Sequence, residues 1–362
     1  KHSFVHEGHD SFHKYYGSRL ESSGDLQTSA ASCSLHCRPV PRSVTDALSL
    51  VHPEVTKRFF GCGLPFPAKL DGCRVLDLGS GSGRDCYAFS KLVGPKGHVT
   101  GIDMTEELIT VSRQYTEYHQ KKFGYKEPNV TFVQGYMENL GEAGIQSDSM
   151  DVVSNCVICL CPDKRTVLQQ AYNMLKEGGE MYFSDMYASK VVPDHVKQDT
   201  VLWGEGMGGS LFWQDLISLA HSVGFSTPHL VSASHIAVHN SELKAKAGDI
   251  SYASGTYRLF KLPKSPVMSE ATVTYKGTLA GFPDQLDFDS SHCFKKDVAV
   301  EVSGEMAEII RSSRFFSDFK IQMLDKPDSS SESTPQVYCH LNPFLLADKL
   351  GSSVKKCSKT SK

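Results

Sequence analysis

The segment VLDLGSGSGRD constrains the fold of this chain more than any other. It places Gly79, Gly81 and Gly83 directly after an apolar stretch typical of a buried strand and directly before a helical segment from Arg84 to Val93. Glycines at such a turn remove side chains that would keep a ligand away from the backbone. The segment therefore predicts a ligand-binding turn, and a tight turn without a ligand is the alternative.

The sequence around this turn alternates between strand and helix patterns. The apolar stretches CRVLDLG and GHVTGIDM precede NVTFVQGYM, DVVSNCVI and GEMYFSDMY, and the last two flank a helical segment that Gly178 is placed to end. This alternation predicts an α/β fold with a doubly wound, mostly parallel sheet. HLVSASHIAVHN and GTYRLFKL follow without a clear helix between them, which predicts an antiparallel edge pair.

Composition restricts the class of protein and its partners. The 362 residues carry 38 Lys and Arg against 41 Asp and Glu, so no basic field is present that would attract nucleic acid or a membrane surface. No apolar run reaches the roughly 18 to 20 residues of a spanning helix, and the N-terminal segment lacks a secretory apolar core. The 11 cysteines are scattered and odd in number, which favours reduced thiols. We expect a cytoplasmic monomer in which Cys73, Cys86 and Cys293 are buried as small hydrophobes.

The spacing of the glycine loop distinguishes between cofactors. The dinucleotide fingerprint G-x-G-x-x-G would need glycine at position 84, which is Arg84. The spacing G-x-G-x-G, with Asp77 before it and Asp103 at the end of the next strand, resembles the S-adenosylmethionine loop of class I methyltransferases. The resemblance implies that Asp103 accepts hydrogen bonds from the ribose hydroxyls. It also implies that Asp77 orients the loop or meets the cationic methionine moiety.

Further residues at the carboxyl ends of strands extend the expected cofactor site, because ligands of open α/β sheets bind at that edge. Met137 is placed to pack on adenine and Glu138 to bond nearby polar edges, although strand-end packing and a solvated acid are the alternative. The residues expected to contact the cofactor are Asp77, Gly79, Gly81, Gly83, Arg84, Asp103, Met104, Met137, Glu138 and Asn155.

Three cysteines are candidates for the crevice beside the cofactor. Cys156 follows the fourth strand, and Cys33 and Cys62 lie in loops ahead of the sheet from which they could reach the same place. Structural zinc sites usually show two paired ligand clusters. Here Cys156-x-x-Cys159 has only a weak mate in Cys33-x-x-x-Cys37, so zinc is the less favoured interpretation.

Motifs along the chain resemble those of animal-type arsenite methyltransferases. They are DLQT, RPVP, GCGL, VLDLGSGSGRDCY, GHVTGIDMT, NVTF, LGEAGI, VSNCV, GGEMYFSDMY and TYRLFK, across most of residues 10 to 262, with SRFFSDF further on. The resemblance implies a class I, Rossmann-like fold and methyl transfer from S-adenosylmethionine to thiol-bound trivalent arsenic. Arsenite and methylarsenite would be substrates, and glutathione or thioredoxin the thiol reductant.

The resemblance also implies arsenic ligands. Cys33, Cys62 and Cys156 match family cysteines, with Cys62 and Cys156 in the catalytic site. The fourth family cysteine belongs to a WGEC motif, and this chain reads WGEG, with Gly206 in its place. The loss puts activity, and above all the later methylations, in question. The preceding Glu205 is expected to orient a ligand or to receive a thiol proton.

The missing sulfur has several candidate sources. We hypothesise that Cys159, Cys161 or a solution thiol such as glutathione supplies it. A tethered ligand acts at an effective concentration of about millimolar or above, so a solution thiol at about that concentration could partly replace it. The alternative is that both cysteines pack the start of the following helix.

The resemblance and the linker segments divide the chain into four parts. Residues 1–43 would hold a helix and a mobile cysteine-bearing loop, 44–187 the S-adenosylmethionine-binding domain, 188–262 a small arsenic-binding region with the edge strands, and 263–362 a small C-terminal module. Two other functions stay open. One is a methyltransferase for a small organic acceptor, and the other is a non-catalytic thiol binder of arsenic or zinc.

Overall fold

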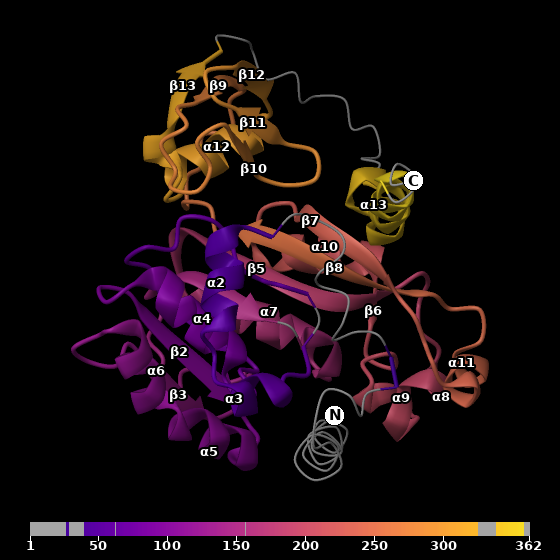
Figure 1. Ribbon diagram of the computed structural model, residues 1–362. Coiled ribbons are helices and arrows are strands. Elements are labelled where there is room, and N and C mark those ends of the chain that lie inside the picture. The colour runs from indigo at the N-terminus through magenta and orange to yellow at the C-terminus, as the bar shows by residue number, and fades with distance from the viewer. Residues whose placement is uncertain (1–26, 29–39, 62, 156, 325–337, 358–362) are drawn as a thin grey trace.

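The largest sheet forms the centre of the computed structural model, which describes residues 27–28, 40–61, 63–155, 157–324 and 338–357 (Figure 1). Its strands are β1 (Arg74–Leu78), β2 (His98–Asp103), β3 (Val130–Gln134), β4 (Met150–Asn155), β5 (Leu175–Ala188), β6 (Leu211–Phe212), β7 (His229–Ile236) and β8 (Tyr252–Phe260). Their order is β3-β2-β1-β4-β5-β8-β7, and the short β6 pairs with β5. Strands β1 to β5 run parallel, whereas β8 is antiparallel to β5 and β7 to β8. The predicted sheet, including its antiparallel edge, is confirmed.

Helices cover both faces of this sheet. They include α2 (Arg42–Ser49), α3 (Pro53–Lys57), α4 (Arg84–Val93), α5 (Glu106–Gln114), α6 (Thr116–Phe123), α7 (Lys164–Met174) and α10 (Trp213–Val223). Successive strand residues point to opposite faces. Accordingly Val75 joins the core under α2 and α4, and Leu76 joins the core under α7 and α10. The doubly wound arrangement follows from strands that are apolar on both faces.

The expected role of Gly178 is wrong. Helix α7 ends at Met174, and Gly178 lies within β5 with φ at 81°. A β-carbon at this position would lie 2.0 Å from the carbonyl oxygen of Ser312, so only glycine allows the two backbones to approach so closely. Gly178 therefore allows close packing against the C-terminal part of the chain and does not end a helix.

Short helices occupy the segments between the later strands. Helices α8 (Asp194–Lys197) and α9 (Thr200–Gly204) follow β5, and the 3-10 helix η4 (Ile158–Leu160) follows β4. Their apolar side chains share one small core with β5. Helix α11 (Ser241–Ala247) separates β7 from β8, where the sequence had shown no clear helix, and the Asn240 side chain caps its first turn.

The C-terminal module is a small α+β unit. Strands β9 (Ala271–Tyr275), β12 (Ala299–Val302) and β13 (Phe319–Met323) form an antiparallel sheet, β10 (Gln285–Asp287) pairs with β11 (Cys293–Lys295), and α12 (Gly304–Ser312) packs on them. After the 3-10 helices η5 (Phe316–Asp318) and η6 (Cys339–Leu341), α13 (Pro343–Cys357) packs against β7 of the large sheet (Figure 1). The chain therefore returns to the first sheet after forming the module.

Two of three expectations about buried cysteines are confirmed. Cys73 and Cys86 are buried, whereas Cys293 is exposed at the start of the short β11 ribbon. The side chain of Cys293 alternates outward on a strand that buries only Phe294, so the expectation of a buried thiol is wrong there. Among the described residues, no helix combines the length and the apolar character that crossing a membrane requires.

Candidate active site

The glycine loop lies at the carboxyl end of β1, where the sequence predicted a ligand. Gly79, Gly81 and Gly83 have φ values of 71°, 55° and 93°, which side-chain-bearing residues rarely adopt. A β-carbon at Gly79 would lie 2.3 Å from Val157 Cγ2, whereas one at Gly81 would meet no atom of the described residues within 4 Å. The loop therefore packs tightly against Val157 at Gly79 and leaves open space beside Gly81.

Asp103 ties this loop to the end of β2. Its Oδ2 accepts a hydrogen bond from the Gly81 amide at 2.9 Å, and its Oδ1 accepts one from the Thr105 amide at 2.8 Å. Inside the loop, the buried Ser80 hydroxyl has no hydrogen-bond partner among the described residues. A buried polar group of this kind calls for a partner, and a polar ligand in the loop would provide one.

Asp77 takes a different position from the loop that follows it. Its buried Oδ2 accepts a hydrogen bond from Cys86 Sγ at 3.4 Å. Burial and the nearby Asp85 carboxylate raise the pKa of Asp77 well above its ordinary value. The residue thus sits beneath the loop, with one oxygen turned to α4.

Most of the predicted cofactor residues line a hollow that consists of two adjoining pockets. Gly79, Asp103, Met104, Met137 and Glu138 line one part. Gly79 and Asp103 also line the adjoining part, together with Asp77, Ser80 and Gly81. The groups present suit S-adenosylmethionine, because they combine an open glycine turn, a buried carboxylate beside it and an apolar wall that contains Met137.

Three predicted cofactor residues are placed differently from the others. Gly83 precedes α4, and a β-carbon on it would press on the Phe132 ring at 2.8 Å. Arg84 Nε donates to Asp85 Oδ1 at 2.8 Å, and its guanidinium lies 3.2 Å from the centre of the Phe59 ring. Asn155 ends β4, in register with Leu78 of β1. A role of these residues at the cofactor stays a prediction.

Cys159 and Cys161 face different neighbours. Cys161 lines the cofactor hollow, and its Sγ donates to Met137 Sδ at 3.2 Å. Cys159 instead lies against Gly206, where an added β-carbon would be 3.1 Å from its sulfur. A β-carbon at Gly209 would be 1.7 Å from the Cys159 carbonyl oxygen, so the 206–209 turn lies directly against η4. The turn that contains Gly206 is therefore in contact with a cysteine from η4.

Sequence reasoning missed Asp185, which lies beside Cys159. Its buried Oδ1 accepts hydrogen bonds from the backbone amides of Cys159 at 3.2 Å and Met186 at 2.9 Å. Burial raises the pKa of Asp185 to about 6, and a hydrogen bond from the Cys159 side chain partly opposes that rise. The only signal for this residue was an acid near the end of the apolar stretch that begins at Met181.

Glu205 is buried next to Gly206 and holds a distant part of the chain. Its Oε2 accepts a hydrogen bond from the Gln27 amide at 2.9 Å, and the next residue, Thr28, bridges to Val238. The carboxylate thus anchors the segment at 27–28 to the end of α9.

The three cysteines predicted to bind arsenic, Cys33, Cys62 and Cys156, lie outside the described residues. The residues beside two of them are described. Gly61 precedes Cys62 and Val157 follows Cys156, and both line the same part of the hollow as Gly79 and Gly81.

The fold and the glycine-loop site define an S-adenosylmethionine-dependent methyltransferase of class I. Residues 69–226 match the family described as "Methyltransferase domain", and residues 268–362 match "Arsenite methyltransferase C-terminal domain". The chain belongs to the arsenite methyltransferase family.

Curated relatives extend over nearly the whole chain. It is 49% identical to mouse arsenite methyltransferase, over 94% of this chain and 92% of that protein. It is 47% identical to human arsenite methyltransferase, over 95% and 92%. The crystal structure of an arsenic(III) S-adenosylmethionine methyltransferase from Chlamydomonas reinhardtii is similar, with a TM-score of 0.75 and 41% identity over 79% of this chain and 97% of that one.

Proposed function

We propose that this chain transfers the methyl group of S-adenosylmethionine to trivalent arsenic held by cysteine thiolates, with arsenite and methylarsenite as substrates. One observation carries the proposal. Gly61 and Val157, the neighbours of Cys62 and Cys156, line the same hollow as the glycine loop and Asp103. Thiols carried by Cys62 and Cys156, with Cys33 as a further ligand, would meet arsenic beside the methyl donor.

The chemistry suits this arrangement. Trivalent arsenic is soft and prefers thiolate ligands, and each thiol that replaces a hydroxide releases water. S-adenosylmethionine supplies an electrophilic methyl group on a sulfonium. The arsenic lone pair forms the new bond to carbon, and the electrons of the broken carbon–sulfur bond stay on that sulfur. No general base is needed in this step, so alignment of the two reactants is the protein's main contribution, worth up to about 7 to 11 kcal/mol in model systems.

The attack raises arsenic formally to the pentavalent state, since its lone pair becomes a bond. Release of a trivalent product therefore requires two electrons. We propose that a thiol reductant, glutathione or thioredoxin, supplies them as it is oxidised to a disulfide.

The contact between η4 and the 206–209 turn suggests which thiol replaces the family cysteine at position 206. We assign this role to Cys159, because its sulfur lies 3.1 Å from where a β-carbon at Gly206 would be. Cys161 suits the role poorly, since its sulfur points to Met137 in the cofactor hollow. Burial and the Glu138 carboxylate also raise the pKa of the Cys161 thiol, which opposes formation of a thiolate.

Asp185 would assist the formation of the Cys159 thiolate. Its carboxylate accepts the side-chain hydrogen bond of Cys159 and has a pKa of about 6, so it is largely ionised at neutral pH. The thiol proton therefore has an acceptor already in contact. Glu205 is the second acid near this place and would act as a positioning residue, because it holds the segment at 27–28 that leads to Cys33.

Arsenite-dependent release of S-adenosylhomocysteine tests the function against its alternatives. The purified chain is mixed with S-adenosylmethionine, glutathione and either arsenite or a panel of small organic oxygen and nitrogen acceptors. Release of S-adenosylhomocysteine with arsenite but with none of the organic acceptors supports the proposal. Release with an organic acceptor but not with arsenite would favour a methyltransferase for small organic molecules. Tight binding of arsenite and S-adenosylmethionine without any release would identify a non-catalytic arsenic binder. In the same assay, a Glu205→Gln variant with unchanged arsenite affinity and rate would remove the role given to Glu205.

The proposal extends to the cellular location, the oligomeric state and the domain boundaries of the chain. We infer a cytoplasmic monomer that does not bind nucleic acid, because the chemistry requires reduced thiols and the formal net charge is -3. The parts 1–43, 44–187, 188–262 and 263–362 stand as proposed divisions of the chain. Size measurement in solution and limited proteolysis test the oligomeric state and these boundaries.

A further inference from the structure

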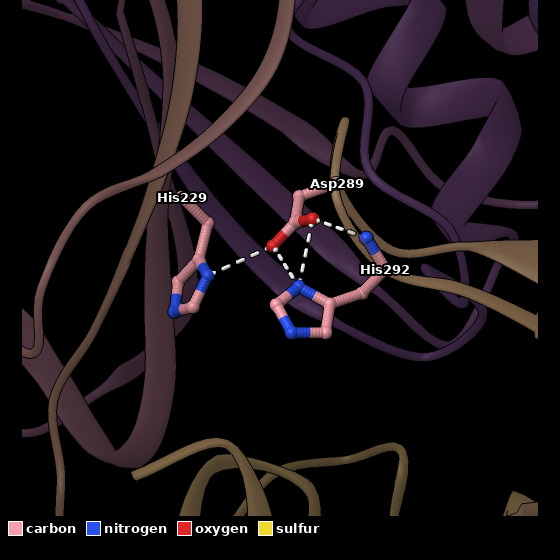
Figure 2. Close-up of side chains that lie close together, drawn as sticks. All are labelled: His229, Asp289 and His292. Atoms are coloured by element: carbon pink, nitrogen blue, oxygen red, sulfur yellow. Dashed lines mark hydrogen bonds and ion pairs between the residues drawn. The ribbon is translucent and has the colours of Figure 1, made fainter. Parts of the chain in front are cut away.

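Two histidines and an aspartate meet where the edge of the large sheet faces the C-terminal module (Figure 2). His229 begins β7, whereas Asp289 and His292 belong to the turn between β10 and β11. His229 Nδ1 lies 2.9 Å from Asp289 Oδ2, and His292 Nδ1 lies 2.9 Å from both carboxylate oxygens. One ligand atom from each residue falls within 4.8 Å of the other two.

We propose that His229, Asp289 and His292 bind a divalent transition-metal ion of the zinc type. Two imidazole nitrogens and one carboxylate oxygen form a donor set that zinc and similar ions of intermediate softness prefer, whereas calcium and magnesium prefer oxygen ligands alone. The ion would join the sheet to the C-terminal module, because β7 and the β10–β11 turn each supply ligands. Among the described residues, the cavity beside this cluster shares no lining residue with the cofactor hollow.

The cluster adjoins open space, and its Asp289 carboxylate is buried between the two rings. An adjoining cavity is lined by Glu270, Glu305 and His340, and Glu270 is exposed, which gives a cation a route from solvent.

The orientation of both histidine rings also fits an ion at this place. Figure 2 shows the Nδ1 atoms of both rings directed at the Asp289 carboxylate and their Nε2 atoms on the far sides. An ion between the two rings would therefore face both Nδ1 atoms and the carboxylate.

Binding requires only a small rearrangement. Bonds of about 2.0 to 2.1 Å to a tetrahedral ion separate its ligand atoms by about 3.3 Å, so each nitrogen–oxygen pair would open by about half an ångström. The proton on each neutral Nδ1 moves to Nε2 by exchange with solvent, and the lone pair left on Nδ1 binds the ion. Water or His340 would complete the coordination.

Zinc titration of the full chain, combined with X-ray absorption at the zinc edge, tests this proposal. Cysteine thiolates elsewhere in the chain are also potential zinc ligands, so the type of ligand is the decisive readout. Sulfur ligands lie at about 2.3 Å, and nitrogen and oxygen ligands at about 2.0 to 2.1 Å. We expect one zinc equivalent with nitrogen and oxygen ligands in the wild-type chain, and its loss in His229→Ala and in His292→Ala.

His235→Ala provides the matched control, because His235 lies on the same strand and bonds to Asp348, away from the cluster. It should keep the zinc equivalent. Zinc bound through sulfur alone in the wild-type chain would overturn the proposal, as would an unchanged nitrogen and oxygen signal in the folded His229 and His292 variants. If both variants fail to fold, the wild-type spectrum decides the matter by itself. Neither result depends on arsenic methylation.

Discussion

Cys159 and Gly206 lie against each other, with 3.1 Å between the Cys159 sulfur and the position of a β-carbon at residue 206. The family resemblance implies a cysteine where this chain has Gly206, and a thiol from η4 lies beside that position. The arrangement keeps a sulfur atom beside the turn although the turn itself has none. The predictions about arsenic binding follow from this contact.

Cys159→Ser should weaken arsenite binding about tenfold or more, because a tethered soft ligand is replaced by a hard hydroxyl of similar size. Binding can be followed by equilibrium dialysis and arsenic quantification. Cys161→Ser is the matched control, since that thiol is equally buried but faces Met137. Equal losses in both variants, or a loss in Cys161→Ser alone, would show that position 159 has no special role.

Moving the thiol to the other side of the contact should restore binding. We expect Cys159→Ser/Gly206→Cys to recover most of the arsenite affinity lost in Cys159→Ser. Gly206 has φ at 86°, so the side chain strains the backbone by about 1 to 2 kcal/mol, and a drop in melting temperature should accompany the recovery. Gly206→Cys alone should be less stable still, because two sulfurs then crowd one place. A double variant that folds but binds no better than Cys159→Ser would refute the exchange.

Arsenite binding should weaken as the pH falls through about 6, where the raised pKa of Asp185 removes the proton acceptor of Cys159. The sign follows from the ionised form being the acceptor: it dominates above that pKa and is lost below it. Asp185→Asn should weaken binding at neutral pH and remove this inflection from the affinity profile measured between pH 5 and 8. The same inflection in the variant would assign the titration to another group.

Gly81→Ala should weaken S-adenosylmethionine binding about tenfold or more without a matching loss of stability. In the part of the chain that the structure describes, a β-carbon at Gly81 meets no atom within 4 Å, so a ligand above the loop is what it would obstruct. Gly124→Ala is the control, since that glycine also has positive φ and open space but ends α6 away from the site. Calorimetric affinities and melting temperatures of both variants separate ligand obstruction from backbone strain. Equal affinities would place the cofactor elsewhere.

The sheet could be predicted because its signals are local. The apolar stretches, the glycine turn and the helix from Arg84 to Val93 each lie within a short window, and all three occur as expected. Gly178 was misread for the opposite reason. Its need for glycine comes from Ser312, which belongs to a part of the chain that no local pattern connects to it.

The site was only partly predictable for the same reason. Asp103 and the loop glycines follow strand ends, so their convergence is a consequence of the fold. The contact of Cys159 with Gly206 and the burial of Asp185 depend on how the α9 turn packs on η4, and the sequence gives no spacing rule for that packing. The cluster of His229, Asp289 and His292 likewise joins segments that are remote from each other along the chain.

The most direct test of the account is mass spectrometry of arsenic species after the purified chain is incubated with arsenite, S-adenosylmethionine and glutathione. We expect methylated arsenic to accumulate together with one S-adenosylhomocysteine for every methyl group transferred. Omission of glutathione should reduce turnover, because the thiol returns the electrons that methylation removes from arsenic. Unmethylated arsenite as the sole species after prolonged incubation, with S-adenosylmethionine bound and the chain folded, would contradict the account.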